Sequence, residues 1–171
     1  MLEAPVAGSR PQAESRALIY FVGGDPIAVE RSRPLLSTMG STIHHVGDVG
    51  KAARFKLAVN AMLAGQVAML GELLGWLKAS GTEPAEAMAV LGELPITSAA
   101  IKGIGGLIAN EIYEPMFPVD LVAKDMAYVV EAMGTDRARA STLTTVRDRY
   151  IEAQRNGWGE LNIQAVARLF L

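Results

Sequence analysis

The sequence has no cysteine, which excludes disulfide bonds and metal sites built on thiolates. It also has no block of basic residues. Because 16 Lys and Arg stand against 18 Asp and Glu, a nucleic acid is not an expected partner. No unbroken apolar run reaches the ~20 residues that cross a bilayer, and the first segment has neither a basic start nor an apolar stretch that directs export. We therefore expect a cytoplasmic protein that does not bind a membrane.

The chain does have length and hydrophobicity. Its 171 residues, 50% of them hydrophobic, can bury the core of one medium domain with a short appendage. The segment "MLEAPVAG" leads from the first residue into a proline-containing stretch with no structural element before it. This beginning predicts a chain cut from something longer.

The first 47 residues predict a strand, a helix and a second strand. The apolar, β-rich run Ala17–Gly24 is stopped by two glycines. Asp25 and Pro26 then supply the cap and the first position of a helix, which is expected to kink or split at Pro34. A second strand is expected over Ser41–Gly47. Such a unit is too small to be a complete domain.

From residue 50 onward the sequence predicts helices only. The longest begins near residue 51 and is expected to end at Gly81. Large apolar residues recur along it with helical spacing, and most of its remaining surface is small, which predicts a helix surrounded by other helices. Shorter helices are expected within 84–93, 98–110, 117–134, 137–157 and 162–170, the last capped by Asn162. The predicted fold class is mainly α, with an all-α domain around one long central helix after the short strand–helix–strand unit.

Two polar residues stand out near the start of the long helix. In "GKAARFKLAVN", Lys56 and Asn60 lie one turn apart and therefore on the same helical face. Ala52, Ala53 and Ala64 near that face would form an alcove of small residues. A lysine buried in such an alcove is suited to general acid/base chemistry, because burial disfavours its charged form. Spacing alone favours the simpler interpretation, a solvated lysine with an asparagine neighbour.

The surrounding residues resemble a family signature. "VGDVGKAARFKLAVN" is similar to the second-domain motif of the β-hydroxyacid dehydrogenases, the family of 3-hydroxyisobutyrate dehydrogenase, with 6-phosphogluconate dehydrogenase as a more distant relative. That motif is a G-x-x-G-x-G turn, three residues, a lysine, two residues and two asparagines. The matching positions are Gly47, Gly50, Lys56 and Asn60. Ala52 stands at the third glycine and Val59 at the first asparagine. The resemblance implies that Lys56 is the catalytic lysine and that Asn60 orients the substrate.

The likeness extends to a substrate loop. "EAPVAGS" resembles the family's D-A-P-V-S-G-G or A-P-V-S-G-S segment, which implies that Ala7, Gly8 and Ser9 bind the substrate carboxylate. The usual serine is Ala7 here, so one hydroxyl is missing. The backbone N–H groups of residues 8 and 9 and one hydroxyl would remain for an anion.

A third segment resembles a part of the family that lies near the cofactor. "FPVDLVAKDMAYVVEAMG" resembles the family's F-x-x-x-L-x-x-K-D-L segment, which implies that Lys124 and Asp125 lie near the nicotinamide end of NAD or NADP. Taken alone, these two residues are typical of a solvated helix face. The resemblance further implies that residues 1–48 are the C-terminal remnant of a Rossmann domain and residues 49–171 an all-α substrate-binding and dimerisation domain.

The sequence lacks the G-x-G-x-M-G turn on which that family holds the pyrophosphate of its cofactor. The "GIGG" segment at residues 103–106 does not replace it, because no strand precedes it. This chain alone is therefore not expected to bind NAD or NADP tightly. His44 and His45 are neighbours on an expected strand and point to opposite faces, so no metal site is expected.

The resemblance as a whole implies a fragment of an NAD(P)-dependent oxidoreductase. It would interconvert a small β-hydroxy acid and its semialdehyde or keto form, with Lys56 as the general acid/base. The implied assembly is a homodimer or homotetramer formed through the helical domain. Two alternatives stay open: a non-enzymatic helical module that oligomerises, and an inactive truncated product without the cofactor fingerprint.

Overall fold

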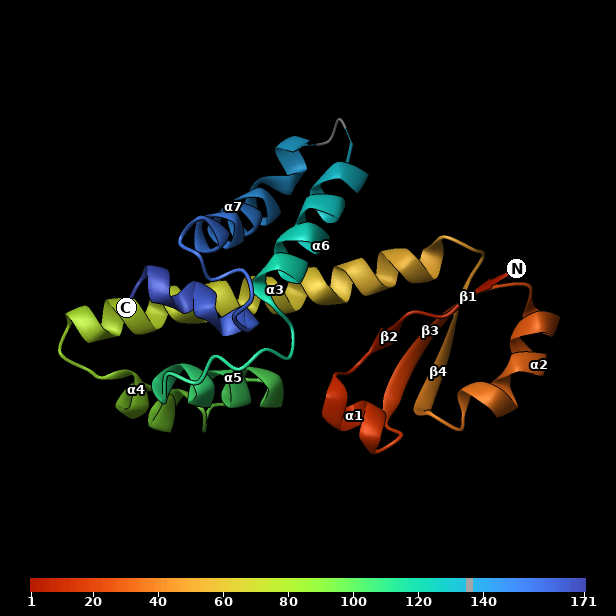
Figure 1. The fold of residues 1–171 in the computed structure, drawn as a ribbon, viewed down its shortest axis with the longest axis horizontal. Helices are drawn as coiled ribbons and strands as arrows, with labels where there is room; N and C mark the ends of the chain where they lie inside the picture. Colours follow the sequence, from red (N-terminus) through yellow and green to blue (C-terminus); the bar gives the residue numbers. More distant parts are fainter. Residues whose placement is uncertain (135–136) are drawn as a thin grey trace. The chain divides into compact units, whose positions relative to one another are not determined.

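The chain divides into two compact units, Met1–Asn60 and Ala61–Leu171. The computed structural model describes residues 1–134 and 137–171. In Figure 1 the first unit, drawn from red to orange, holds the sheet, and the second unit is built of helices. Helix α3, Lys51–Ala79, begins in the first unit and continues into the second.

A four-stranded mixed sheet forms the centre of the first unit. Its central strand β3, Leu18–Gly24, pairs in parallel with β4, Gly40–Gly47. On its other side β3 pairs antiparallel with two very short strands, β1 (Leu2–Glu3) and β2 (Val6–Ala7). Helix α1, Arg10–Glu14, connects β2 to β3. The first residues of the chain are thus fixed to the middle of the sheet.

Helix α2, Pro26–Leu36, connects β3 to β4. Its predicted cap is confirmed, since the Asp25 carboxylate accepts hydrogen bonds from the N–H groups of Ile27 and Ala28, each at 3.0 Å. Of the two outcomes expected at Pro34, a kink or a split, the split is wrong, because the helix continues through that residue. Pro34 lies in the last turn, where its missing N–H removes a single helical bond.

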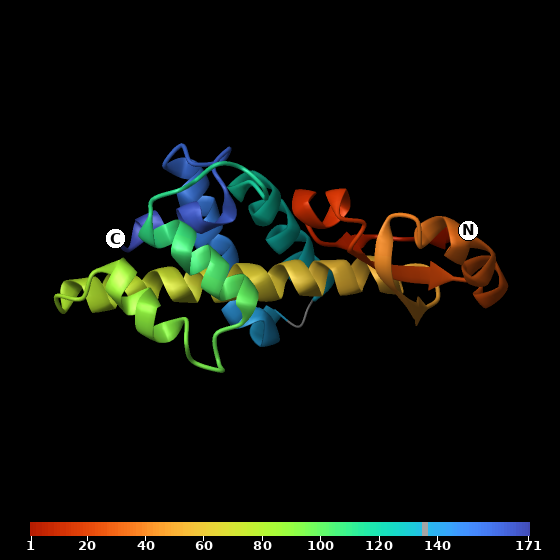
Figure 2. The same ribbon diagram turned by 90° about the horizontal axis from the view of Figure 1, so that it is seen from below.

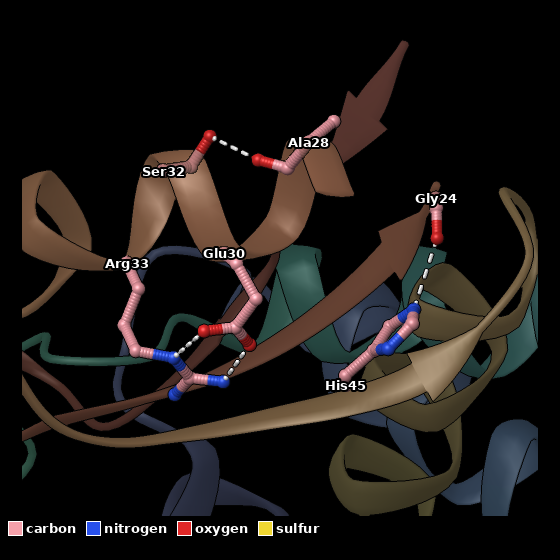
Figure 3. Close-up of polar contacts among 6 residues, drawn as sticks. All are labelled: Gly24, Ala28, Glu30, Ser32, Arg33 and His45. Carbon is pink, nitrogen blue, oxygen red and sulfur yellow. Dashed lines mark hydrogen bonds and ion pairs between the residues drawn. The ribbon is translucent and has the colours of Figure 1, made fainter. Parts of the chain in front are cut away.

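One face of the sheet packs against α2. Tyr20, Val22 and Val29 form this small core and are 5%, 0% and 1% exposed. Helix α2 also carries a solvent-exposed ion pair between Glu30 and Arg33, drawn in Figure 3. A hydrogen bond from the Arg33 guanidinium lowers the pKa of the Glu30 carboxyl. Because solvent screens such a pair, it contributes little to stability.

The predicted fold class, mainly α with a short strand–helix–strand remnant, is wrong. The structure shows an α/β unit with a four-stranded sheet, two helices and its own apolar core, followed by helices. The strands β1 and β2 have two residues each, and α1 has five. Such short elements fall below the length over which a hydrophobic period can be recognised, so the sequence pattern did not reveal them.

The second unit is a set of helices around α3. In Figure 1, α4 (Pro84–Leu91) and α5 (Ala99–Ala109) lie on one side of α3, and α6 (Val119–Ala132) and α7 (Ser141–Arg155) lie on the other. Figure 2 shows α5 running obliquely across α3. The short 3₁₀ helix η1, Arg137–Ala140, precedes α7. The 3₁₀ helix η2, Ile163–Leu169, packs against α5, α6 and α7, which joins the two sides.

The η2 segment approaches α3 closely along the small residues of that helix. A Cβ atom added at Gly71 would lie 2.8 Å from the Cα and Cβ atoms of Ala167. One added at Gly75 would lie 2.9 Å from the Cβ of Phe170. Ala68 on the same helix is also buried. Part of the expected cover of the long helix is therefore present, where η2 lies on its small residues within the second unit.

A second face of α3 is exposed, which differs from the expectation of a helix covered all round. The large side chains on it lie within a narrow sector at helical spacing, and we call them the α3 stripe. They are Met62, Met69, Leu73 and Trp76, which are 63%, 63%, 43% and 66% exposed. By length and composition α3 is also apolar enough to cross a membrane, a test that the core helix of a folded domain passes as well. Of its most apolar window, 44% is buried inside the protein.

Buried amides fix the position of η2. The Asn162 side-chain oxygen accepts hydrogen bonds from the N–H groups of Met116, at 3.0 Å, and Phe117, at 2.7 Å. The Asn162 amide donates to Gln164, which in turn donates to the Ile112 carbonyl. Asn162 occupies the predicted N-cap position of η2, but its side chain makes no capping hydrogen bond and instead ties η2 to the loop before α6.

Gly71→Ala is expected to destabilise the protein by about 1–3 kcal/mol, because its Cβ has no room against Ala167. Gly103 in α5 is the matched control, since an added Cβ there meets nothing within 4 Å. Gly103→Ala is expected to stabilise by about 0.5–1 kcal/mol through helix propensity. Urea unfolding of both variants measures the two effects. A Gly71→Ala variant as stable as Gly103→Ala would contradict the close packing of η2 on α3.

Candidate functional site

The first turns of α3 carry Lys56 and Asn60. Lys56 is half-buried, and Asn60 is only 7% exposed. The two residues share a helical face because they are four positions apart. Ala52, one turn earlier, is fully buried, whereas Ala53 is exposed. Part of the predicted alcove is therefore present, and the amide of Asn60 is held almost entirely away from water.

The turn before α3 needs two of its glycines. Gly47 has a φ of 111° and Gly50 a φ of 97°, a region that a residue with a Cβ rarely adopts. Ala52 stands at the third glycine of the family motif and already belongs to the helix, where a Cβ causes no backbone strain. The departure at Ala52 therefore leaves the turn intact.

The structure shows that Glu3, which the sequence analysis did not single out, contacts the start of α3. The Oε1 atom of Glu3 accepts hydrogen bonds from the N–H groups of Gly50, at 2.7 Å, and Ala52, at 2.8 Å. These donors belong to the start of α3, whose cap position is a glycine without a side chain. A signal was available, because Glu3 opens the "EAPVAGS" segment and an acidic residue also opens the family's D-A-P-V-S-G-G pattern.

The predicted substrate loop lies at the end of β2. Ala7 pairs with Ile19 of β3, and Gly8 follows with a φ of 120°. Ser9 starts α1, where its N–H and its hydroxyl both donate to the Gln12 side-chain oxygen, at 2.9 and 3.2 Å. Both donors of Ser9 are exposed, so an anion could take the place of the Gln12 oxygen.

Lys124 and Asp125 lie on α6, in the second unit. The Lys124 side chain is 50% exposed and that of Asp125 is 17% exposed. The Lys124 Nζ atom lies 3.5 Å from Oδ1 of Asp125. The other predicted site residues all belong to the first unit, and the placement of this pair near a nicotinamide ring stays a prediction.

An aromatic stack fixes the first turns of α3 against the sheet. The Phe21 ring centroid lies 6.0 Å from that of Phe55 and 6.1 Å from that of His44, with 19° between the planes in each case. The next residue, His45, has its Nε2 atom 2.9 Å from the Gly24 carbonyl oxygen, as Figure 3 shows. These aromatic rings border an open hollow of about 650 Å³. The stack thus holds the residue next to the candidate lysine.

The helix starts of the first unit do not fit a pyrophosphate, which in dinucleotide folds lies on the free N–H groups after a strand. Protein groups already accept these N–H groups. Asp25 does so at α2, Glu3 at α3 and Gln12 at α1. Within residues 1–134 and 137–171, no group of three or more His, Asp or Glu side chains is placed to hold a metal ion.

Two family models match the chain and together cover most of it. "NAD-binding of NADP-dependent 3-hydroxyisobutyrate dehydrogenase" matches residues 50–170. "NAD binding domain of 6-phosphogluconate dehydrogenase" matches residues 1–47. The second match supports the correction made above, since the α/β unit at the start corresponds to part of a cofactor domain and the chain is not an all-α protein.

Individual relatives agree with these models. Glyoxylate/succinic semialdehyde reductase 1 of Arabidopsis thaliana is 29% identical over 96% of this chain and 57% of its own length. NAD-dependent L-serine dehydrogenase of Pseudomonas aeruginosa is 30% identical over 99% of this chain and 59% of its own length. This chain therefore spans little more than half of these relatives.

Solved structures share the fold. The crystal structure of 3-hydroxyisobutyrate dehydrogenase from Salmonella typhimurium has a TM-score of 0.91 at 21% identity, over 99% of this chain and 60% of that one. The Mycobacterium tuberculosis 3-hydroxyisobutyrate dehydrogenase with L-serine has a TM-score of 0.86 at 25% identity, over 98% of this chain and 60% of that one.

Proposed function

We propose, because this chain belongs to the β-hydroxyacid dehydrogenase family of 3-hydroxyisobutyrate dehydrogenase, that it carries the acid/base residues of an NAD(P)-dependent oxidoreductase. The reaction interconverts a small β-hydroxy acid and its semialdehyde or keto form. One observation carries the proposal: half-buried Lys56 and buried Asn60 share a face of α3, directly after a turn whose glycines Gly47 and Gly50 have positive φ angles.

Lys56 exchanges a proton with the substrate. During oxidation its neutral amine takes the proton of the substrate hydroxyl, and during reduction its ammonium returns a proton to the carbonyl oxygen. Asn60 orients the substrate with an amide whose direction is fixed by burial. NAD or NADP, the cofactor named by both family models and by the serine dehydrogenase relative, supplies the hydride exchange. We assign Lys124 and Asp125 to the neighbourhood of its nicotinamide.

A carboxylate on the substrate agrees with the loop at residues 7–9. Glyoxylate, succinic semialdehyde and L-serine, named for the relatives above, all carry one. In this chain the N–H and the hydroxyl of Ser9 donate to the Gln12 side-chain oxygen. An oxygen of the substrate carboxylate can take the place of that acceptor. Ala7 contributes no hydroxyl, so the affinity for the carboxylate depends on the donors of residues 8 and 9.

The α3 stripe supports self-association of the second unit. Four large apolar side chains with 43–66% exposure lie along about four turns of one helix, which is more than scattered surface residues provide. A symmetric dimer would bury the same stripe on both subunits. The same surface would serve the alternative function, a non-enzymatic module that oligomerises.

Lys56→Ala in the enzyme form that turns over is expected to lower kcat/KM by about 10²–10⁴-fold, the usual contribution of a general acid/base. Circular dichroism and the Tm are expected to stay close to the native values. Lys78→Ala is the matched control, because Lys78 is an exposed lysine in the last turn of the same helix. Retained turnover in Lys56→Ala would remove the proposed role.

Isothermal titration of this chain with NAD and with NADP is expected to show no binding tighter than about 1 mM. The physical reason is that protein groups already accept the N–H groups at the helix starts that could hold a pyrophosphate. Micromolar binding of either dinucleotide would contradict this part of the proposal.

Trp76→Glu in the α3 stripe is expected to convert a dimer or tetramer at micromolar concentration into a monomer, because it places a charge in the buried interface. Ile96→Glu is the control, since Ile96 is 88% exposed in the loop between α4 and α5. Sedimentation velocity measures the mass of each form. A monomeric native chain under the same conditions would count against self-association through this stripe.

A further inference from the structure

Glu3 connects two parts of the first unit that are distant in sequence. Its Oε1 atom accepts hydrogen bonds from Gly50 and Ala52, which lie 47 and 49 residues further along the chain. Glu3 itself lies on β1, four residues before the substrate loop begins at Ala7. Gly50 and Ala52 open the helix that carries Lys56. A single carboxylate oxygen therefore joins the start of the loop segment to the start of the catalytic helix.

The helix start has no acceptor of its own for these donors. Gly50 occupies the cap position, where a side-chain oxygen would normally accept the first N–H groups. The intervening N–H, that of Lys51, donates to the Asp48 carbonyl at 3.2 Å. Three successive N–H groups at the helix start are thus satisfied, two of them by Glu3.

The sheet holds the carboxylate in place. In the β1–β3 pair, Glu3 is opposite Gly23 and Leu2 is opposite Gly24, so the backbone of Glu3 has a fixed register. A Cβ atom added at Gly23 would lie 2.6 Å from Oε1 of Glu3 and 2.8 Å from the Asp48 carbonyl oxygen. The absence of a side chain at Gly23 therefore leaves space for the Glu3 carboxylate to reach the turn before α3.

We propose that Glu3 is a positioning residue for the reaction, because it fixes the first turn of α3 relative to the substrate loop, both along the helix axis and in rotation about that axis. This inference rests on the acid/base role proposed above for Lys56. An α-helix transmits a displacement of its first turn to the next, since each residue is fixed at about 1.5 Å and 100° from its neighbour. A misplacement of about 1 Å in a reacting group can lower a rate by about a hundredfold.

The test uses the enzyme form that turns over and compares Glu3→Ala, which loses the acceptor, with Glu3→Gln, which keeps an amide oxygen that can accept from the same N–H groups. Glu3→Ala is expected to lower kcat at least about tenfold, with the KM for NAD(P) changed less than about twofold. Glu3→Gln is expected to retain at least about a third of kcat, since a neutral oxygen accepts the same N–H groups more weakly. Glu30→Ala is the control, because that carboxylate is exposed on α2 and its hydrogen bonds go to Arg33 of the same helix.

The measurements are made well below the Tm of every variant, so that a cap with a purely structural role is recognised. Such a cap would lower the Tm of Glu3→Ala and leave the kcat of the folded enzyme unchanged, and this result would overturn the inference. Amide hydrogen exchange at residues 50–52 gives a readout that does not need turnover. It is expected to accelerate in Glu3→Ala and to stay unchanged in Glu30→Ala; unchanged exchange in Glu3→Ala would also overturn the inference.

The same series separates the inference from the proposed function. If Lys56→Ala keeps full turnover, the acid/base role fails, and the positioning role that rests on it fails as well. If Lys56→Ala is inactive while Glu3→Ala keeps the native kcat, the acid/base role stands and the positioning role alone is wrong. Loss of kcat in both, with rescue by Glu3→Gln, supports both.

Discussion

The arrangement of the first unit depends on which groups accept hydrogen bonds from the N–H groups at the start of α3. A helix that begins after a glycine turn has N–H groups with no side-chain cap of their own, and an acceptor supplied from elsewhere in the chain stabilises such a helix start. Glu3 and the Asp48 carbonyl accept them here. Because Glu3 belongs to the sheet, these hydrogen bonds also determine how the strands, the glycine turn and the helix with Lys56 fit together. The positive φ angles of the turn and the missing side chain at Gly23 are conditions for them.

The sequence predicted those elements whose signals are local. The strand β3, the cap at Asp25 and the length of α3 follow from apolar periodicity, capping chemistry and terminal glycines, and the structure has them. The family motif located Lys56 and Asn60 on one helix face. The two-residue strands β1 and β2 are strands only because β3 pairs with them, so no spacing within them could show it. The bond from Glu3 to a turn 47 residues away likewise leaves no periodic pattern.

The long helix shows a second limit of periodicity. Its composition indicates a helix that packs on several sides, but composition does not decide which stripe faces the core. The position of η2 decides it, because Ala167 and Phe170 approach α3 where Gly71 and Gly75 leave room. Val67, Leu70 and Leu74 of α3 are buried together with these small residues, whereas Met62 and Trp76 remain exposed on another face. The elements that pack on the helix therefore decide which of its large side chains are buried, and composition alone does not show it.

The hydrogen bonds from Gly50 and Ala52 to Glu3 also limit what the glycine turn can bind. A G-x-x-G turn followed by a helix has the composition of a phosphate-binding loop, because its N–H groups can point to one anion. At Gly50 and Ala52 the anion that receives them is the carboxylate of Glu3. A dinucleotide phosphate would have to displace a charge held by the sheet at its optimal distance. The turn before Lys56 therefore positions the start of α3, and its N–H groups at Gly50 and Ala52 bind a carboxylate of the same chain.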